Sequence, residues 1–180
     1  MSGVWDLAAL AARTMATPPR CGLVRVLAID GGAAAGKSTV AAQLAALLPG
    51  SVVLHTDDLL DGWDGQLGFH HRLREQVLAP LAAGRPGRYR RYDWIAGAFG
   101  TEVVVAVPKC LVIEGVSALL ACAGYSSLEI FVDVPRSVRE QRWIERDGPP
   151  QPEWQAWLDR EDLYFAAHPL PVSTVVLHDC

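Results

Sequence analysis

The chain of 180 residues contains no asparagine, and only two of its sixteen basic residues, Lys37 and Lys109, are lysines. Without asparagine it cannot form the Asn-Lys-x-Asp motif that reads guanine, which argues against a GTPase switch. Acidic residues outnumber basic ones by twenty to sixteen, and the net charge of −4 offers no electrostatic footprint for duplex nucleic acid or an anionic membrane. We therefore expect no nucleic-acid partner and no membrane partner.

Cysteine and long apolar runs are also scarce. The four cysteines show no Cys-x-x-Cys spacing and are too few for a disulfide framework, which indicates reduced thiols; they are Cys21, Cys110, Cys122 and Cys180. No apolar run approaches the roughly 20 residues that span a bilayer, and the amino-terminal segment carries Asp6 rather than a basic leader. We expect a cytoplasmic protein that is neither exported nor embedded, and the sequence leaves its oligomeric state open.

A glycine-rich stretch at residues 31–39 follows an apolar run and opens an alanine-rich segment. It matches the Gly-x-x-x-x-Gly-Lys-[Ser/Thr] phosphate-loop pattern. Glycines let backbone N–H groups approach phosphate oxygens, and the start of the following helix favours an anion. Lys37 would reach the outer phosphates and Ser38 would hold Mg²⁺. Rather than a glycine-rich turn without a ligand, we expect a nucleotide site formed by Gly31, Gly32, Ala33, Ala34, Ala35, Gly36, Lys37, Ser38 and Thr39.

Strand and helix patterns alternate along the chain. The apolar run 24–30 is typical of a strand buried on both faces of a parallel sheet. Further strands are expected at 51–58, 109–114, 128–134 and 172–177, with an edge strand at 101–107. Helices are expected at 4–16, 37–48, 66–83, 135–147 and 152–167. This order predicts an α/β class, the P-loop NTPase three-layer fold, with a five-stranded parallel sheet and helices on both faces. We expect a helical arm at 1–20 and one domain at 21–180.

Carboxylates follow two of the predicted strands. Asp57 and Asp58 end one of them, and Glu114 ends another. Ligands bind at the carboxyl ends of parallel strands, so these acids are expected near the phosphates. One aspartate, Asp57 rather than Asp58, would accept the proton of a substrate hydroxyl, and the other would orient Mg²⁺ or the substrate. Glu114 would hold a Mg²⁺-bound water, and Asp57 is a further metal candidate. Alternatively, the aspartate pair caps the next helix.

Two aromatic segments are candidates for the acceptor side. The loop 59–65 is acidic, aromatic and glycine-containing, and such a loop could line a pocket. In the turn-rich segment 84–94, Tyr92, Asp93 and Trp94 could bind substrate, with an aromatic face against a ring and a carboxylate for hydroxyl groups. A solvated connection with aromatic anchors explains that segment equally well. Two further tryptophans, Trp154 and Trp157, are expected to be core contacts.

The helix after Pro135 carries four arginines on one face, at spacings of three, three and four: Arg136, Arg139, Arg142 and Arg146. A phosphoryl-transfer enzyme needs cations that close over the transferring group. We therefore expect an arginine-bearing lid near residues 136–150. A solvated stripe paired with Glu140 and Glu145 is the alternative.

Together these motifs resemble the uridine kinase-like family of P-loop phosphotransferases, which includes pantothenate kinases and phosphoribulokinases, from about Val24 to Arg146. The likeness rests on residues 31–39, His55–Asp58, Tyr92-Asp93, Ile113–Gly115, Phe131–Asp133 and the arginines that follow. It implies that residues 21–180 are a kinase domain using ATP and Mg²⁺ and that Asp57 is the base. Lys37, as the loop motif indicates, would be a catalytic cation. The likeness also implies that Arg139, Arg142 and Arg146 hold phosphates and that Tyr92 contacts a nucleoside base.

The sequence departs from that family mainly on the acceptor side. Gly97 stands where uridine kinases have a histidine, Leu59-Leu60 replaces an aromatic, and Ala35 replaces a loop hydroxyl. We predict transfer of the γ-phosphoryl group of ATP to a nucleoside hydroxyl. Another small acceptor, such as a sugar, a pantothenate-like molecule or an antibiotic, stays open, as do a non-catalytic ATP-binding regulator and the choice of ATP over GTP.

Overall fold

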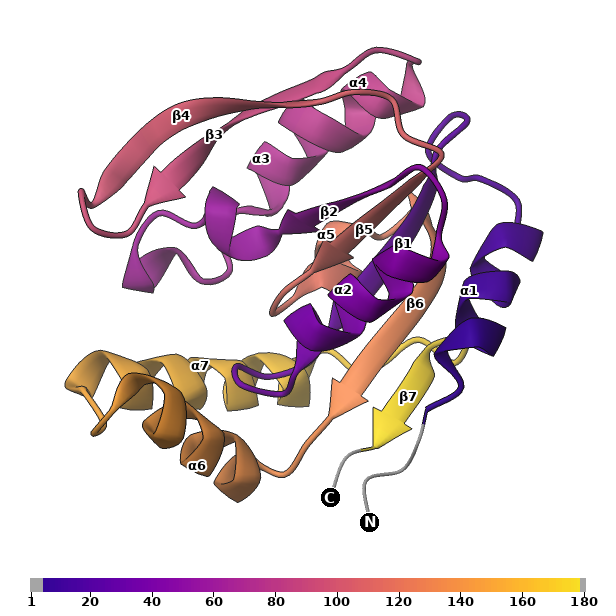
Figure 1. Ribbon diagram of the computed structural model, residues 1–180. Helices are drawn as coiled ribbons and strands as arrows, with labels where there is room; N and C mark the ends of the chain where they lie inside the picture. The colour runs from indigo at the N-terminus through magenta and orange to yellow at the C-terminus, as the bar shows by residue number, and fades with distance from the viewer. Residues whose placement is uncertain (1–4, 179–180) are drawn as a thin grey trace.

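A sheet of five parallel strands in the order β2-β5-β1-β6-β7 forms the centre of the computed structural model, which describes residues 5–178 (Figure 1). The strands span Arg25–Asp30 (β1), Ser51–His55 (β2), Cys110–Glu114 (β5), Ser126–Asp133 (β6) and Val175–His178 (β7). Every neighbouring pair in this sheet is parallel. The predicted α/β fold with five parallel strands is therefore confirmed.

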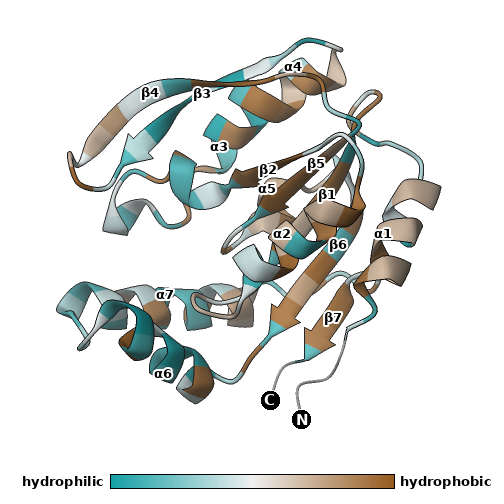
Figure 2. Cartoon of the chain, in the orientation of Figure 1, coloured by the Kyte–Doolittle hydropathy of each residue, from teal (hydrophilic) through white to brown (hydrophobic). Residues whose placement is uncertain are grey.

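Side chains of the central strands alternate between two hydrophobic cores, one on each face of the sheet. In β1, Val26 and Ala28 belong to one core, whereas Leu27 and Ile29 belong to the other. All four are fully buried, and Figure 2 shows the central strands as mostly hydrophobic. The unbroken apolar run follows from this burial, because a strand covered on both faces has no side for polar residues.

Helices cover both faces of the sheet. One face carries α1 (Leu7–Ala16) and α2 (Lys37–Leu47), whose side chains share a core with Leu27. On the other face lie α3 (His70–Leu73), α4 (Ala79–Ala82) and α5 (Ala118–Ala121). A π-helical turn, Arg74–Leu78, joins α3 to α4, so the helical segment expected at 66–83 starts at His70. Short 3-10 turns at Thr56–Leu59 and Trp63–Gly65 precede it.

Two further helices lie beyond the carboxyl ends of the strands (Figure 1). They are α6 (Arg136–Asp147), which follows β6, and α7 (Pro152–Ala167). The rings of Trp143 and Trp154 stack between them at a centroid separation of 4.5 Å. Between the helices, Gly148 has a φ of 91°, which suits a glycine at the end of a helix.

A strand is present where one was expected at 101–107, but the segment 84–94, expected as a basic loop, contains a strand as well. The two strands form an antiparallel hairpin of β3 (Gly87–Asp93) and β4 (Ala98–Val105), outside the parallel sheet. Tyr89 is buried while Arg88 and Arg90 are exposed. Buried and exposed residues thus alternate in this part of β3, as is typical of a strand with one covered face. The exposed residues are arginines close to turn residues, a composition typical of a loop, and the expectation of a loop was therefore wrong.

The described residues also bear on redox state and membranes. Cys21, Cys110 and Cys122 are free and buried, whereas Cys180 lies outside the described residues. Within residues 5–178, no helix has the length and apolar character needed to cross a bilayer.

The double-sided burial of β5 generates a stability prediction. Leu111 is fully buried, so Leu111→Ala should lower the free energy of unfolding by about 2–5 kcal/mol through lost burial and a cavity. Leu163 on α7 is 72% exposed, and Leu163→Ala should change it by no more than about 0.5 kcal/mol. Urea titrations of both variants measure the difference, and equal midpoints would contradict this description of the core.

Candidate active site

The phosphate-loop motif connects β1 to α2. Three of its residues have positive φ: Gly31 at 141°, Ala34 at 60° and Gly36 at 93°. A Cβ atom on Gly31 would lie 2.5 Å from the carbonyl oxygen of Val132, so a larger residue does not fit there. Ala34 adopts its left-handed conformation at a cost of about 1 kcal/mol, and such strained residues cluster at functional sites. The loop wraps the N-terminus of α2, where an anion is favoured.

Hydrogen bonds fix this loop at both ends. Nζ of Lys37 donates to the carbonyl oxygen of Gly32 at 2.8 Å, and the lysine is nearly buried. At the end of β1, the carboxylate of Asp30 accepts hydrogen bonds from three backbone N–H groups, those of Gly31, Ser117 and Leu119. Burial raises the pKa of Asp30 to about 6 despite these bonds. Asp30 thus ties the loop to α5, a role that the sequence motif did not reveal.

Glu114 lies where β5 ends, level with Ile29 of β1 and His55 of β2. Its Oε1 atom accepts a hydrogen bond from Oγ of Ser38 at 2.9 Å and lies 2.5 Å from Nδ1 of His55. Burial alone would raise the pKa of Glu114, but the bonds from His55 and Ser38 and the charge of Lys37 outweigh it and lower the pKa. The hydrogen bond to Glu114 raises the pKa of His55. A carboxylate is therefore maintained beside the Ser38 hydroxyl.

Ser38 and Glu114 fit the requirements of Mg²⁺. Both present oxygen atoms at the same cavity, and Mg²⁺ prefers oxygen ligands. Among residues 5–178, no group of three or more His, Cys, Asp or Glu side chains is arranged to hold a metal. That finding is compatible with Mg²⁺, which keeps several waters and is commonly bound through one or two protein oxygens plus substrate phosphates.

The two neighbouring aspartates have different surroundings. Asp57 lines the cavity and keeps contact with solvent, yet the surrounding protein desolvates its carboxylate and raises its pKa, against the nearby charge of Lys37. Asp58 instead turns toward β3, where Oδ2 accepts hydrogen bonds from the Tyr89 hydroxyl at 2.9 Å and Nε of Arg91 at 3.0 Å. Only Asp57 of the pair faces the space next to Ser38 and Glu114.

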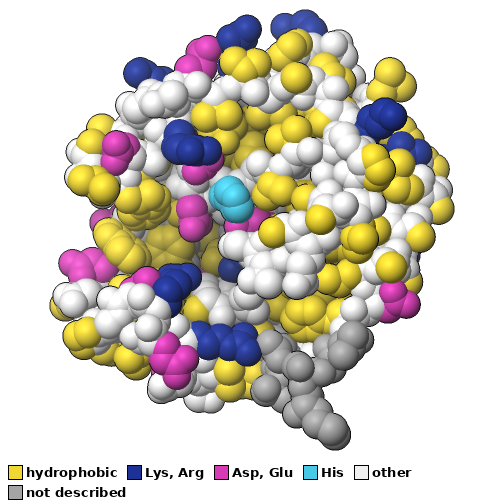
Figure 3. All heavy atoms as spheres, viewed as in Figure 1, with side chains coloured by type: hydrophobic (Ala, Val, Ile, Leu, Met, Phe, Trp, Pro, Cys, Tyr) yellow, Lys and Arg dark blue, Asp and Glu magenta, His cyan; other side chains and the backbone are white. Residues whose placement is uncertain are grey.

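A cavity of about 600 Å³ adjoins the phosphate loop. Figure 3 shows a hollow lined by hydrophobic side chains between the hairpin and the α6–α7 pair. Five of the six tryptophans of the chain line this cavity: Trp63, Trp94, Trp143, Trp154 and Trp157. The polar and charged residues that line it are Lys37, Ser38, Asp57, Glu114, Arg146, Asp147 and Gln151. The cavity therefore combines charged groups of the loop and the strand ends with a wall of tryptophans, called the aromatic wall below.

The aromatic wall combines residues from distant parts of the chain. Trp63 makes edge-to-face contacts with Trp94 of the hairpin turn and with Trp157 of α7, at centroid separations of 5.6 and 5.7 Å. The expectation that the loop 59–65 lines a pocket agrees with this position of Trp63. Trp154 and Trp157, expected to be core contacts only, are buried and also line the cavity. Trp143 was not identified in the sequence, since a buried tryptophan on a helix carries no signal of its own.

Of the predicted substrate-binding residues in the hairpin, Trp94 lines the cavity. Tyr92 packs edge-to-face against Trp94 and supports it, with ring centroids 5.2 Å apart. Asp93 ends β3, and its Oδ1 accepts hydrogen bonds from the N–H groups of the turn residues Ile95 and Ala96. Gly97 closes the same turn with a φ of 65°. A glycine at this position is therefore explained by hairpin geometry.

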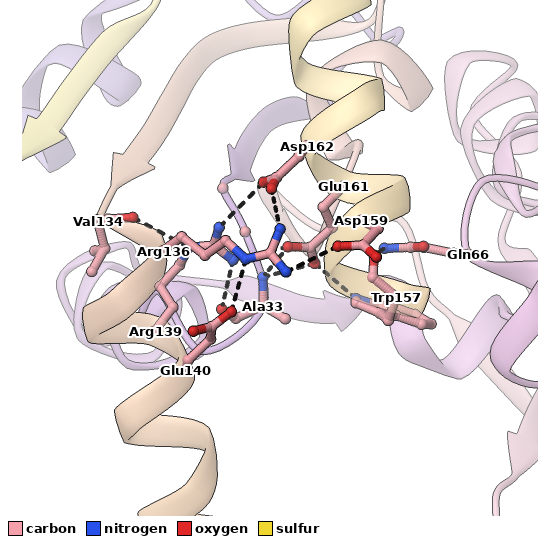
Figure 4. A network of polar contacts seen from close by, with 12 residues as sticks. Ala33, Gln66, Val134, Arg136, Arg139, Glu140, Trp157, Asp159, Glu161 and Asp162 are labelled. Atoms are coloured by element: carbon pink, nitrogen blue, oxygen red, sulfur yellow. Dashed lines mark hydrogen bonds and ion pairs between the residues drawn. The ribbon is translucent and has the colours of Figure 1, made fainter. Parts of the chain in front are cut away.

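The four arginines of α6 have separate surroundings, although they share a face. Arg146 lines the cavity and pairs with Asp147. Arg139 is buried against the phosphate loop and paired with Glu161 of α7 (Figure 4). Arg142 is half-buried. Arg136 forms ion pairs with three carboxylates, those of Glu140, Asp159 and Asp162.

Comparison with known proteins adds a relationship to this geometry. No protein-family model matches the chain. Uridine kinases of Borrelia turicatae and Borrelia hermsii are each 26% identical to it, over 148 and 140 residues, covering 69% of this chain and 68% of each relative. A possible uridine kinase structure from Bacillus stearothermophilus matches with a TM-score of 0.67 at 23% identity, covering 96% of this chain and 97% of that one. A proposed fructose transport system kinase from Silicibacter matches with a TM-score of 0.65 at 20% identity, covering 95% and 98%.

The chain is thus similar in sequence to curated uridine kinases and similar in fold to these two solved structures. The resemblance seen in the motifs is supported by sequence matches that cover 69% of the chain. The curated relatives are kinases, which supports a kinase. The solved neighbours have acceptors of different chemistry in their names, and for this chain they establish the fold.

The environment of Asp57 predicts a trade-off between activity and stability. An acid whose pKa is raised in the folded state binds protons more readily there than in the unfolded state, so its contribution to stability is lost as pH rises toward the folded pKa. Asp57→Asn removes this effect. The variant should melt at a higher temperature than the wild type at pH 7, and the difference should disappear below about pH 4, where the unfolded carboxyl is also protonated. Thermal unfolding across pH measures this, and a lower melting temperature at pH 7 would contradict it.

Proposed function

We propose that this protein transfers the γ-phosphoryl group of ATP to a hydroxyl group of a nucleoside. One observation carries the proposal: Lys37, Ser38, Asp57 and Glu114 line the same cavity as five tryptophans. The phosphate loop supplies a site for the donor, Asp57 supplies a base, and the aromatic wall supplies a surface for a planar ring.

On the donor side, the loop and the N-terminus of α2 would bind the phosphates through backbone N–H groups. The Lys37 ammonium group would move from Gly32 to the outer phosphates, since its present acceptor lies within the loop. Ser38 and Glu114 would hold Mg²⁺, directly or through water, and the ion would neutralise charge on the β- and γ-phosphates. Arg146 lines the same cavity and adds a cation close to the transferring group.

On the acceptor side, the Asp57 carboxylate would accept the proton of the attacking hydroxyl. The hydroxyl oxygen forms a bond to the γ-phosphorus as the bond to the ADP oxygen breaks, so the products are the phosphorylated acceptor, ADP and a proton. The raised pKa of Asp57 brings this base closer to neutral pH, where proton transfer is more effective. Asp58 is less suited, because Tyr89 and Arg91 already occupy its carboxylate.

The aromatic wall favours a nucleoside over a sugar. A sugar presents many hydroxyl groups that need hydrogen-bond partners, whereas a nucleoside adds a planar base that can stack on indole rings. Away from the loop, few polar side chains line the cavity, Gln151 and Asp147 among them. A sugar, a pantothenate-like molecule or an antibiotic remains the alternative acceptor, and a non-catalytic ATP-binding regulator the alternative function.

An acceptor screen tests the reaction itself. With ATP and Mg²⁺, we expect ADP release to depend on uridine or another nucleoside and to exceed release with fructose, gluconate or pantothenate. Lys37→Ala should lower kcat/KM by about 10²-fold or more, because a cation on the transferring phosphates is lost. Coupled ADP assays measure both. Binding of ATP without acceptor-dependent ADP release would favour the regulator, and a faster reaction with a sugar would reassign the substrate.

The tryptophan wall predicts how acceptor affinity responds to mutation. Trp63→Ala should raise KM for the nucleoside by about 5–100-fold, as expected when one base–aromatic stack is lost, and Trp63→Phe should raise it less. The KM for ATP should change little, since Trp63 follows Asp57 in the chain and contacts Trp94, on the side that we assign to the acceptor. Trp5 is the matched control: its Nε1 donates to the carbonyl oxygen of His178, and it does not line the cavity. If Trp5→Ala and Trp63→Ala gave the same acceptor KM, the wall would have no role in binding.

A further inference from the structure

Glu161 of α7 is a buried carboxylate in direct contact with the phosphate loop. It has no solvent exposure and accepts hydrogen bonds from three donors of different kinds (Figure 4). These are the backbone N–H of Ala33, at 2.8 Å to Oε1 and 3.1 Å to Oε2, Nε1 of Trp157 at 2.7 Å, and Nη1 of Arg139 at 2.9 Å. One side chain thus connects the loop, the aromatic wall and α6.

Arg139 contacts the loop as well. Its Nη1 atom donates to the carbonyl oxygen of Ala33 at 3.3 Å, and Nε donates to that of Val134 at 3.2 Å. The guanidinium group also fills the space beside Gly32, where an added Cβ atom would lie 2.2 Å from Nη1. Only a residue without a side chain fits against a cation held this firmly. Gly32 has no positive φ, so its requirement for glycine comes from this packing.

Arg136, a second arginine of α6, also forms ion pairs with α7, and these pairs do not involve the phosphate loop. Arg136 pairs with Asp159 at 3.0 Å and with Asp162, and these side chains are partly exposed. Such exposed pairs join α6 to α7 and contribute little to stability. The Arg139–Glu161 pair is buried, with side-chain exposures of 7% and 0%, and a buried pair offers little net stability for its cost of desolvation. The Arg139–Glu161 pair differs from the pairs of Arg136 in that it contacts Gly32 and Ala33.

We propose that Glu161 and Arg139 are positioning residues, which hold the Gly32–Ala33 segment in the shape that binds nucleotide and join it to Trp157 of the acceptor wall. Arg139 acts through the loop, since its guanidinium group already donates to Val134, Ala33 and Glu161. The inference rests on the proposed function only in requiring that the loop binds ATP.

Glu161→Gln with Asp159→Asn as the matched control separates this role from helix packing. Both changes convert a carboxylate of α7 that pairs with an arginine of α6 into an amide, but only Glu161 contacts the loop. We expect Glu161→Gln to weaken binding of a non-hydrolysable ATP analogue with Mg²⁺ about tenfold or more. The KM for ATP should rise by a similar factor. Asp159→Asn should stay within about twofold of the wild type. Titration calorimetry gives the affinities, and melting curves confirm folding.

The measured affinities distinguish this proposal from two rival explanations of the Arg139–Glu161 pair. Tighter analogue binding by Glu161→Gln would overturn the proposal, because Glu161 would then be an anion that competes with phosphate for Ala33 and Arg139. Equal effects of the two substitutions would reduce the pair to helix packing and overturn it as well. A wild-type protein that binds no ATP analogue would instead refute the proposed function.

Gly32→Ala provides an independent test if Glu161→Gln does not fold. Alone, it should weaken analogue binding, because the new methyl group collides with Arg139 and shifts the loop. In an Arg139→Ala background the collision is removed, and the added methyl group should cost little further affinity. The two effects should therefore be non-additive. Additive losses in this cycle would show that Arg139 does not act through Gly32, and would overturn the proposal.

Discussion

The pairing of β5 with β1 on one side and β2 on the other determines where the polar groups of the site lie. Because all three strands run in the same direction, Glu114, the loop after β1 and the aspartates after β2 emerge at one edge of the sheet. Backbone hydrogen bonds set this register, and alternating burial in two cores prevents a shift by one residue. The carboxylate beside Ser38 is therefore a consequence of strand registry.

Features of the site that depend on neighbouring residues in the chain could be predicted from the sequence. The loop motif specifies its own backbone, since Gly31 and Gly36 supply positive φ values, and apolar runs ending in acids indicated Asp57 and Glu114. Contacts between distant residues were beyond this reasoning. Ala33 and Glu161 are 128 positions apart, and a glutamate in a helix with other charged residues looks like a solvated one. The hairpin was missed for a related reason, because arginine hides the alternation of an exposed strand.

The elements outside the sheet carry much of what is particular to this protein. Helices α6 and α7 contribute Trp143, Trp154 and Trp157 to the cavity, and the hairpin contributes Trp94. The parallel sheet positions the phosphate-loop motif, whereas this surrounding shell sets the size and chemistry of the cavity. The arginine face of α6 serves several purposes at once, since its members lie against the loop, the cavity and the neighbouring helix.

The distribution of tryptophan has an optical consequence. Five indole rings line a single cavity, while Trp5 contacts the carbonyl oxygen of His178 away from it. Indole emission depends on the polarity and the quenching groups around the ring, so the intrinsic fluorescence of the whole protein is dominated by the surroundings of the cavity. A ligand that displaces water from the wall changes the signal of most of the emitters together. The fold thereby provides a built-in reporter of occupancy that requires no attached dye.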